Sequence, residues 1–175
     1  MEQLWSPWRL AYITGGASAG GCVFCRALTD PGADDLIVHR GTTCFVILNL
    51  FPYNNGHLMV IPKRHLASLV EATSEELGEL IELTRLSEIA LREAYSPHGL
   101  NMGINLGKPA GAGVLDHVHM HIVPRWSGDT NFMTVVGETR VLPEELSETA
   151  KKMRPIFAKL AQHELSAEEG KLSTP

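Results

Sequence analysis

The sequence has no long hydrophobic run and no excess of basic residues. No apolar stretch in its 175 residues approaches the roughly 18 that a membrane-spanning helix requires, so we expect no membrane partner. The first residues do not combine a basic segment with an apolar one, which argues against a secretory signal and for a cytoplasmic protein. The formal net charge of −5 disfavours binding to polymeric nucleic acid, but it is compatible with a local site for a small phosphorylated ligand.

Cysteine is also scarce, and its three copies do not suggest a disulfide framework. Cys44 lies in an apolar segment, where we expect a small buried side chain. Cys22 and Cys25 form a C-x-x-C pair with the spacing of half a tetrahedral zinc site. The alternatives are two plain reduced thiols or a redox-active pair, and no thioredoxin-like sequence surrounds the pair to favour the latter.

Aromatic residues make up only 6% of the chain, yet residues 1–14 contain Trp5, Trp8 and Tyr12. A glycine-rich tether follows, so we expect residues 1–21 to form an arm that docks on its own domain or on a partner subunit. The length suits one main domain, which we place at residues 22–138. A C-terminal helix with a frayed tail is expected in residues 139–175.

The pattern of apolar residues predicts an α+β fold. We expect an antiparallel sheet of about five strands, at residues 36–39, 44–50, 57–62, 102–106 and 117–124. A capping box of Thr73 and Glu76 begins one long helix, which ends before Ser96 because proline follows. A second helix is predicted from Pro143, with a kink at Pro155 and fraying from residue 166.

Three histidines alternate with apolar residues between positions 117 and 121. In an extended strand His117, His119 and His121 share one face, and the intervening residues pack on the core. One interpretation is a half-buried strand whose histidines only satisfy hydrogen bonds. A second is a metal site, although His117 and His121 would lie about 13 Å apart along a strand, too far for one ion to bind all three. A third makes the central histidine a nucleophile.

The segment from His117 to Val123 resembles the His-φ-His-φ-His-φ-φ motif, with φ an apolar residue, of the histidine triad (HIT) proteins, which are nucleotide hydrolases and transferases. Asn49, followed eight residues later by His57, resembles that family's ribose-binding strand and neighbouring histidine. The segment from Asn105 to Gly107 resembles its phosphate-side Asn-x-Gly element. The flanks, residues 4–9 and 124–132, resemble the bacterial branch that includes diadenosine tetraphosphate phosphorylases.

The resemblance implies a role for each histidine. A neutral imidazole at His119 would attack an α-phosphorus and form a covalent nucleotidyl-histidine. His117 and His121 would stabilise charge on the non-bridging oxygens, and His57 would add a donor or orient the ring of His119. Asn49 would bind the ribose hydroxyls, although a polar residue that merely ends a strand is the simpler alternative.

The loop before the triad departs from the family pattern. It has Gly111-Ala112-Gly113 where many members have Gly-Gln-Ser/Thr, so backbone N–H groups are expected to replace the glutamine. The expected phosphate-side contacts are therefore Asn105, Gly107, Lys108, Gly111 and Gly113. His121 stands at the position where a glutamine is typical of the sugar-nucleotide transferases and of some phosphorylases. This difference argues against sugar-nucleotide transfer as the function.

The resemblance also implies a metal and a partner. Several HIT relatives hold zinc on a C-x-x-C pair and two histidines, which implies a structural Zn²⁺ on Cys22, Cys25, His65 and His117. His117 would then be a ligand instead of a phosphate contact. A homodimer is implied as well. The expected function is cleavage of dinucleoside polyphosphates with phosphate or water as acceptor. The alternatives are hydrolysis of nucleoside phosphoramidates or adenylylated small molecules, and nucleotide binding without turnover.

Overall fold

The computed structural model describes residues 21–29, 36–129 and 144–172. The predicted aromatic arm, the predicted helix start at Pro143 and the end of the 124–132 flank lie outside these ranges. No helix in the described part of the chain is long and apolar enough to cross a membrane.

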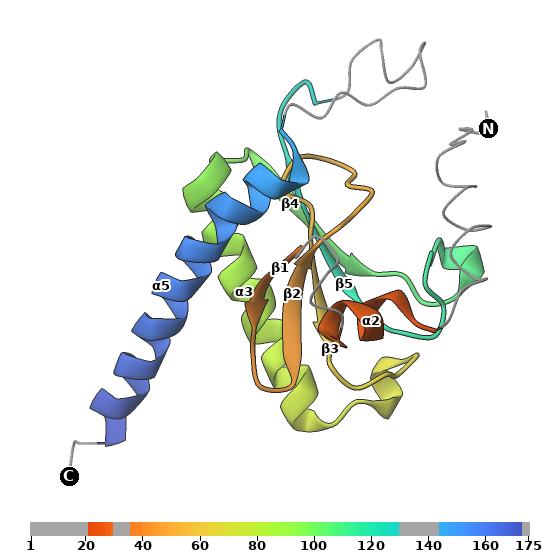
Figure 1. The fold of residues 1–175 in the computed structure, drawn as a ribbon, viewed down its shortest axis with the longest axis horizontal. Helices are drawn as coiled ribbons and strands as arrows, with labels where there is room; N and C mark the ends of the chain where they lie inside the picture. The colour runs from red at the N-terminus through yellow and green to blue at the C-terminus, as the bar shows by residue number, and fades with distance from the viewer. Residues whose placement is uncertain (1–20, 30–35, 130–143, 173–175) are drawn as a thin grey trace.

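One antiparallel sheet of five strands forms the centre of the described structure, in the order β1-β2-β3-β5-β4 (Figure 1). The strands are β1 (Ile37–Arg40), β2 (Cys44–Leu48), β3 (Leu58–Pro62), β4 (Gly99–Ile104) and β5 (Met120–Arg125). The predicted α+β class and antiparallel sheet are confirmed.

Two strand predictions are wrong in their boundaries. β4 begins at Gly99 and ends at Ile104, whereas residues 102–106 were expected. β5 begins at Met120, so His117 and His119 precede it and only His121 lies on the strand. The physical reason is a tertiary contact: the N–H of Val118 bonds to the carbonyl of Leu66 at 2.8 Å, which draws this segment toward the loop after β3.

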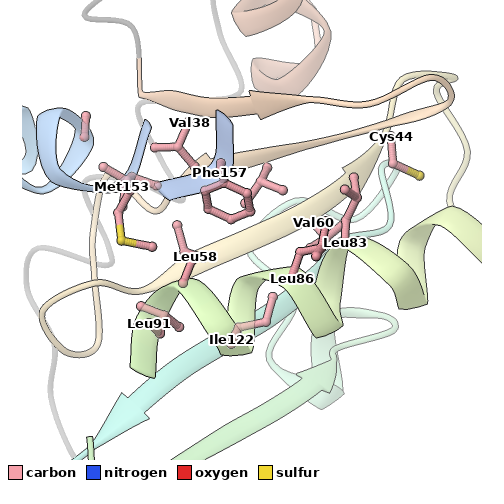
Figure 2. Close-up of a cluster of buried hydrophobic side chains, with 14 of the residues drawn as sticks. Val38, Cys44, Leu58, Val60, Leu83, Leu86, Leu91, Ile122, Met153 and Phe157 are labelled. Carbon is pink, nitrogen blue, oxygen red and sulfur yellow. The ribbon is translucent and has the colours of Figure 1, made fainter. Parts of the chain in front are cut away.

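Period-two alternation in the central strands buries both faces of the sheet. On one face, apolar residues of β2 and β3 pack against α3 (Ser74–Tyr95) and α5 (Leu146–Leu172), as Figure 2 shows. On the other face, the alternate residues of the same strands pack against α2 (Val23–Thr29). Leu58 and Val60 thus face the long helices, while Met59 and Ile61 face α2.

The predicted long helix is confirmed in detail. The Thr73 hydroxyl accepts from the N–H of Glu76, and the Glu76 carboxylate accepts from the N–H of Thr73, which completes the capping box. Ser96 caps the C-terminus at φ 45°, and Pro97 follows. Two 3-10 turns, η1 (Leu69–Glu71) and η2 (Lys108–Ala110), lie in the connecting loops.

The C-terminal helix differs from its prediction in extent. α5 begins at Leu146 and runs to Leu172, beyond residue 165 where fraying was expected. It continues through Pro155 as one helix. Pro155 and Lys151, whose carbonyl loses its bond to the missing N–H, are both exposed, so water can satisfy that carbonyl. The apolar side chains along one face of the helix at Ala150, Met153 and Phe157 are buried, and those of Leu146 and Leu160 are partly buried.

Candidate active site and cysteine–histidine cluster

His119 is almost fully buried, with 4% of its surface exposed. Its Nδ1 lies 2.9 Å from the backbone carbonyl oxygen of His117, so Nδ1 carries the proton and donates it. The lone pair is then on Nε2. Burial lowers the pKa of His119, and the hydrogen bond to the carbonyl only partly opposes this. The ring is therefore neutral at pH 7, as a nucleophile requires.

His57 and His121 form a pair of histidines beside His119. The rings of His119 and His121 lie 4.8 Å apart at 76°. His57 is 1% exposed, and its Nε2 lies 3.0 Å from Nδ1 of His121. Tyr53 donates its backbone N–H to Nδ1 of His57 at 3.1 Å. The structure thus brings His57 into contact with a member of the triad.

Asn49 lies beside the same pair. Its Oδ1 accepts from the N–H of Phe51 at 2.9 Å, and its Nδ2 lies 3.4 Å from Nδ1 of His57. These contacts use one lone pair and one N–H of the amide, which leaves a second of each to contact a ligand.

An open pocket of about 490 Å³ lies beside His119 and His121. Part of this volume is open to solvent. Its lining combines aromatic and apolar side chains with one amide and two imidazoles: Phe24, Asn49, Phe51, Tyr53, Met59, Gly111, Gly113, Val114, His119 and His121. Aromatic and apolar walls suit a nucleoside base, and the imidazole donors suit phosphate oxygens.

The structure separates the expected phosphate-side residues into two groups. Gly111 and Gly113 line the pocket, whereas Asn105, Gly107 and Lys108 are not among its lining residues. The loop also uses its own donors. The N–H groups of Ala110 and Ala112 bond to the carbonyl of Gly107, and that of Gly111 bonds to the carbonyl of Lys108. In this conformation these three N–H groups are not available to a phosphate.

Cys22, Cys25, His65 and His117 form a second cluster of polar side chains. Their potential ligand atoms all lie within 4.8 Å of one another. Nδ1 of His117 lies 3.2 Å from Sγ of Cys22 and 3.7 Å from Sγ of Cys25, and Nδ1 of His65 lies 3.4 Å from Sγ of Cys25. Neighbouring ligand atoms of a tetrahedral zinc site lie about 3.3–3.8 Å apart, so the donor set fits this ion.

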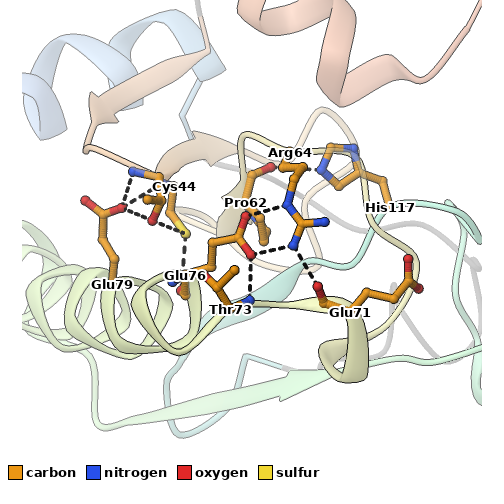
Figure 3. A network of polar contacts seen from close by, with 9 residues as sticks. Cys44, Pro62, Arg64, Glu71, Thr73, Glu76, Glu79 and His117 are labelled. Atoms are coloured by element: carbon orange, nitrogen blue, oxygen red, sulfur yellow. Dashed lines mark hydrogen bonds and ion pairs between the residues drawn. The ribbon is translucent and has the colours of Figure 1, made fainter.

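The two histidines of the cluster are oriented by their other ring nitrogens. Nε2 of His117 donates to the carbonyl of Pro62 at 2.9 Å (Figure 3), which leaves the lone pair on Nδ1, the atom that faces Cys22 and Cys25. Nε2 of His65 lies 3.6 Å from a carboxylate oxygen of Asp116. Carbonyl and carboxylate partners of this kind fix the tautomer of metal-binding histidines.

The cluster does not resemble a redox site. Burial and the neighbouring Cys22 raise the pKa of the Cys25 thiol, whereas redox-active cysteines have a lowered pKa.

The loop that carries His65 is anchored to α3 by its neighbour Arg64. Arg64 bonds to the Glu76 carboxylate of α3 and to the carbonyl of Glu71 (Figure 3).

Sequence reasoning missed the role of two aromatic residues. Phe24 lies between the two cysteines on α2, which was itself not predicted, and its ring lies 5.1 Å from that of His119. Tyr53 lies in the loop before His57 and packs on it with ring centroids 4.8 Å apart. The one available signal for Tyr53 was an aromatic residue in a polar, turn-rich loop between two expected site residues.

The five-stranded antiparallel sheet and its helices form the fold of a HIT protein. Residues 31–128 match the HIT domain family, and the chain belongs to this family. It is similar to AP-4-A phosphorylase of Mycobacterium tuberculosis (strain H37Rv), with 34% identity over 167 residues, 91% of this chain and 86% of that protein.

Two solved structures of histidine triad proteins are similar to this chain in fold. A Zn-bound histidine triad family protein from Mycobacterium smegmatis superposes with a TM-score of 0.65 and 28% identity, over 82% of this chain and 97% of that one. A hypothetical histidine triad nucleotide-binding protein from Sulfolobus tokodaii strain7 has a TM-score of 0.65 and 30% identity, over 79% of this chain and 93% of that one. The expected family is thus confirmed.

Proposed function

We propose that this protein cleaves dinucleoside polyphosphates, such as diadenosine tetraphosphate, at an α-phosphate through a nucleotidyl-His119 intermediate. The observation that carries the proposal is the hydrogen bond from Nδ1 of His119 to the carbonyl of His117. It leaves a lone pair on Nε2 of a neutral, buried imidazole that lines the open pocket. The similarity to a protein named AP-4-A phosphorylase supports the substrate class.

In the first half-reaction, Nε2 of His119 attacks the α-phosphorus in line and displaces the polyphosphate chain. A donor on His121 stabilises the charge on the oxygens around phosphorus. Asn49, with one lone pair and one N–H still available, binds the ribose hydroxyls. The aromatic and apolar wall formed by Phe24, Met59 and Val114 accommodates the base.

In the second half-reaction, an acceptor displaces His119 from phosphorus. Water gives a nucleoside monophosphate, and inorganic phosphate gives a nucleoside diphosphate. We favour phosphate because the chain is similar to a protein named as a phosphorylase. The second anion then lies near Gly111 and Gly113, which line the pocket next to the histidines.

We also propose that Cys22, Cys25, His65 and His117 bind one Zn²⁺. The donor distances, the orienting partners of both histidines and the similarity to a Zn-bound relative support this assignment. Four protein ligands leave no open coordination position, so the metal supplies stability and not chemistry. It ties α2 and the loop after β3 to the segment that carries His119.

A homodimer is the proposed assembly. β4 lies at the end of the described sheet, and its residues Asn101, Met102 and Gly103 are exposed along that edge. An exposed strand edge can pair with a second copy. Light scattering after gel filtration should give twice the chain mass, and a monomer at micromolar concentration would contradict this assembly.

Incubation with diadenosine tetraphosphate, with and without radioactive phosphate, tests the function. Phosphorolysis yields ATP and ADP, with the label in ADP. Unlabelled AMP and ATP under millimolar phosphate would show a hydrolase instead. Nucleotide binding without any product would favour a regulatory binding module. Faster turnover of adenosine 5′-phosphoramidate than of diadenosine tetraphosphate would favour a phosphoramidate hydrolase.

A further inference from the structure

Tyr53 contacts both members of the His57–His121 pair. Its ring centroid lies 4.8 Å from that of His57 at an interplanar angle of 39°, and 6.0 Å from that of His121 at 30°. These separations are typical of favourable aromatic pairs. Tyr53 also lines the pocket, so one residue packs on the pair and faces the substrate side.

The backbone of Tyr53 determines the protonation state of His57. A peptide N–H can only donate, so Nδ1 of His57, 3.1 Å away, must carry a lone pair. The N–H of Asn49 is directed to the same nitrogen, because Oδ1 of Asn49 already accepts from the N–H of Phe51. His57 is therefore neutral, with its proton on Nε2.

The state of His121 follows from that of His57. Nε2 of His57 donates to Nδ1 of His121 over 3.0 Å, so Nδ1 of His121 is an acceptor and its proton is on Nε2. A second proton on Nδ1 would face the proton of His57. Two fixed donors at Tyr53 and Asn49 thus hold both imidazoles neutral along one chain of hydrogen bonds.

We propose that Tyr53 is a positioning residue that holds His57 and His121 in these tautomers, so that His121 acts as a hydrogen-bond donor and not as an acid. This inference rests on the proposed function and narrows its substrate class. His121 can stabilise charge through Nε2–H, but transfer of that proton would leave an imidazolate in the His57–His121 pair. The leaving group must then depart without a proton.

The first step can proceed at a site that supplies no proton. The lone pair on Nε2 of His119 forms the N–P bond, and the P–O bond to the polyphosphate breaks with its electron pair on the departing oxygen. A polyphosphate is stable as that anion and requires no proton. An amine leaving group requires one, since an amide anion is too basic to depart. We therefore infer a preference for polyphosphate over phosphoramidate substrates.

Substitution of the ring tests the positioning role. Tyr53→Phe keeps the ring and the N–H, so its kcat should stay within about threefold of the wild type. Tyr53→Ala keeps the N–H but removes the ring, and its kcat on diadenosine tetraphosphate should fall at least about tenfold with little change in KM. Zinc content and Tm of both variants report whether they remain folded. Wild-type kcat in Tyr53→Ala would overturn the positioning role.

Nitrogen chemical shifts test the tautomers without any turnover. In ¹⁵N-labelled protein between pH 6 and 8, His57 and His121 should each show a protonated Nε2 and an unprotonated Nδ1. In Tyr53→Ala the N–H remains but the ring that packs His57 against it is lost, so the His57 and His121 shifts should move toward an average of the two tautomers. A proton on Nδ1 of His57 in the wild type would overturn the inference, even if the enzyme were active.

Comparison of two substrates tests the substrate class. The value of kcat/KM should be at least about a hundredfold higher for diadenosine tetraphosphate than for adenosine 5′-phosphoramidate. Equal values would show that the site supplies a proton, which contradicts the inference while leaving nucleotidyl transfer intact. If neither substrate reacts, the proposed function fails, and the nitrogen shifts still decide the role of Tyr53.

Discussion

The backbone carbonyl of His117 accepts a hydrogen bond from Nδ1 of His119 at 2.9 Å, while the side chain of His117 points into the cysteine cluster. One residue thus serves two sites through different atoms. Its imidazole is fixed by Pro62 on one side and by the cysteines on the other. The position of the carbonyl, and with it the ring of His119, depends on that fixation.

Removal of one cysteine should therefore affect both sites. Cys25→Ser should reduce the zinc content from about one per chain and lower Tm, because structural zinc binding contributes folding free energy. It should also reduce kcat, since His117 loses a fixed partner. Elemental analysis, thermal unfolding and turnover of diadenosine tetraphosphate measure the three effects.

Cys44→Ala is the matched control for this prediction. Cys44 is buried in the core on the opposite face of the sheet and lies outside the cluster. This variant should keep its zinc and lose only the stability of a small core truncation. Stable, fully active and metal-free wild-type protein would contradict the zinc assignment.

Phe24 connects the cluster to the pocket through packing alone. Its side chain is 5% exposed and packs against residues such as Phe45 and Met59. Phe24→Ala should lower the free energy of unfolding by about 3–5 kcal/mol, as for other buried aromatic truncations. The kcat should also fall, because the ring of His119 loses its 5.1 Å neighbour. Urea unfolding and steady-state kinetics measure these effects.

Phe24→Leu serves as the milder companion variant, since it fills part of the same volume. Both variants keep all four proposed ligands, so their zinc content should equal that of the wild type. Unchanged kcat in Phe24→Ala would show that the contact with His119 has no functional effect.

The fold should lose stability in acid partly through Glu76. Hydrogen bonds from Arg64, together with that from the N–H of Thr73, lower the pKa of Glu76 from 4.5 to about 2. A lowered carboxyl pKa stabilises the folded state above pH 4.5, and this contribution is lost as the pH falls toward 2. The free energy of unfolding should therefore decrease over this range, and Glu76→Gln should decrease less.

The free energy of unfolding of the wild type and of Glu76→Gln is compared at pH 5 and at pH 2.5. The change in their difference between the two pH values isolates this effect from other acid-sensitive groups. Glu75→Gln, an exposed neighbour in the first turn of α3, controls for the general effect of a charge at a helix N-terminus. Equal pH dependence in wild type and Glu76→Gln would contradict the assignment.

The local signals in the sequence predicted what depends on neighbouring residues. The Thr73–Glu76 box and the alternation in β2 and β3 determine their elements directly, and the motif around His119 indicated the family. The boundary of β5 did not follow, because the bond from Val118 to Leu66 joins segments far apart in the chain. Helix α2 was missed because its seven residues, although apolar at positions 23, 24, 27 and 28, are too few for helical periodicity to be detected.

The phosphate-side loop shows the same limit. Its glycines suggested a set of N–H donors, but three N–H groups bond within the loop. Tyr53 is the opposite case, a contact that the sequence did not predict. Its packing on His57 depends on the path of the loop and not on residue type. The partners in tertiary contacts of this kind do not follow from a single sequence.

The most direct test of the account is rapid-quench mapping of the covalent intermediate. Wild-type protein is mixed with diadenosine tetraphosphate without phosphate, quenched at neutral to alkaline pH and analysed by peptide mass spectrometry. We expect an adenylyl group on His119, its loss on addition of phosphate, and no adduct in His119→Ala, whose kcat should fall at least about 10³-fold. Turnover near the wild-type rate in His119→Ala, or an adduct on another residue, would contradict the central role of His119.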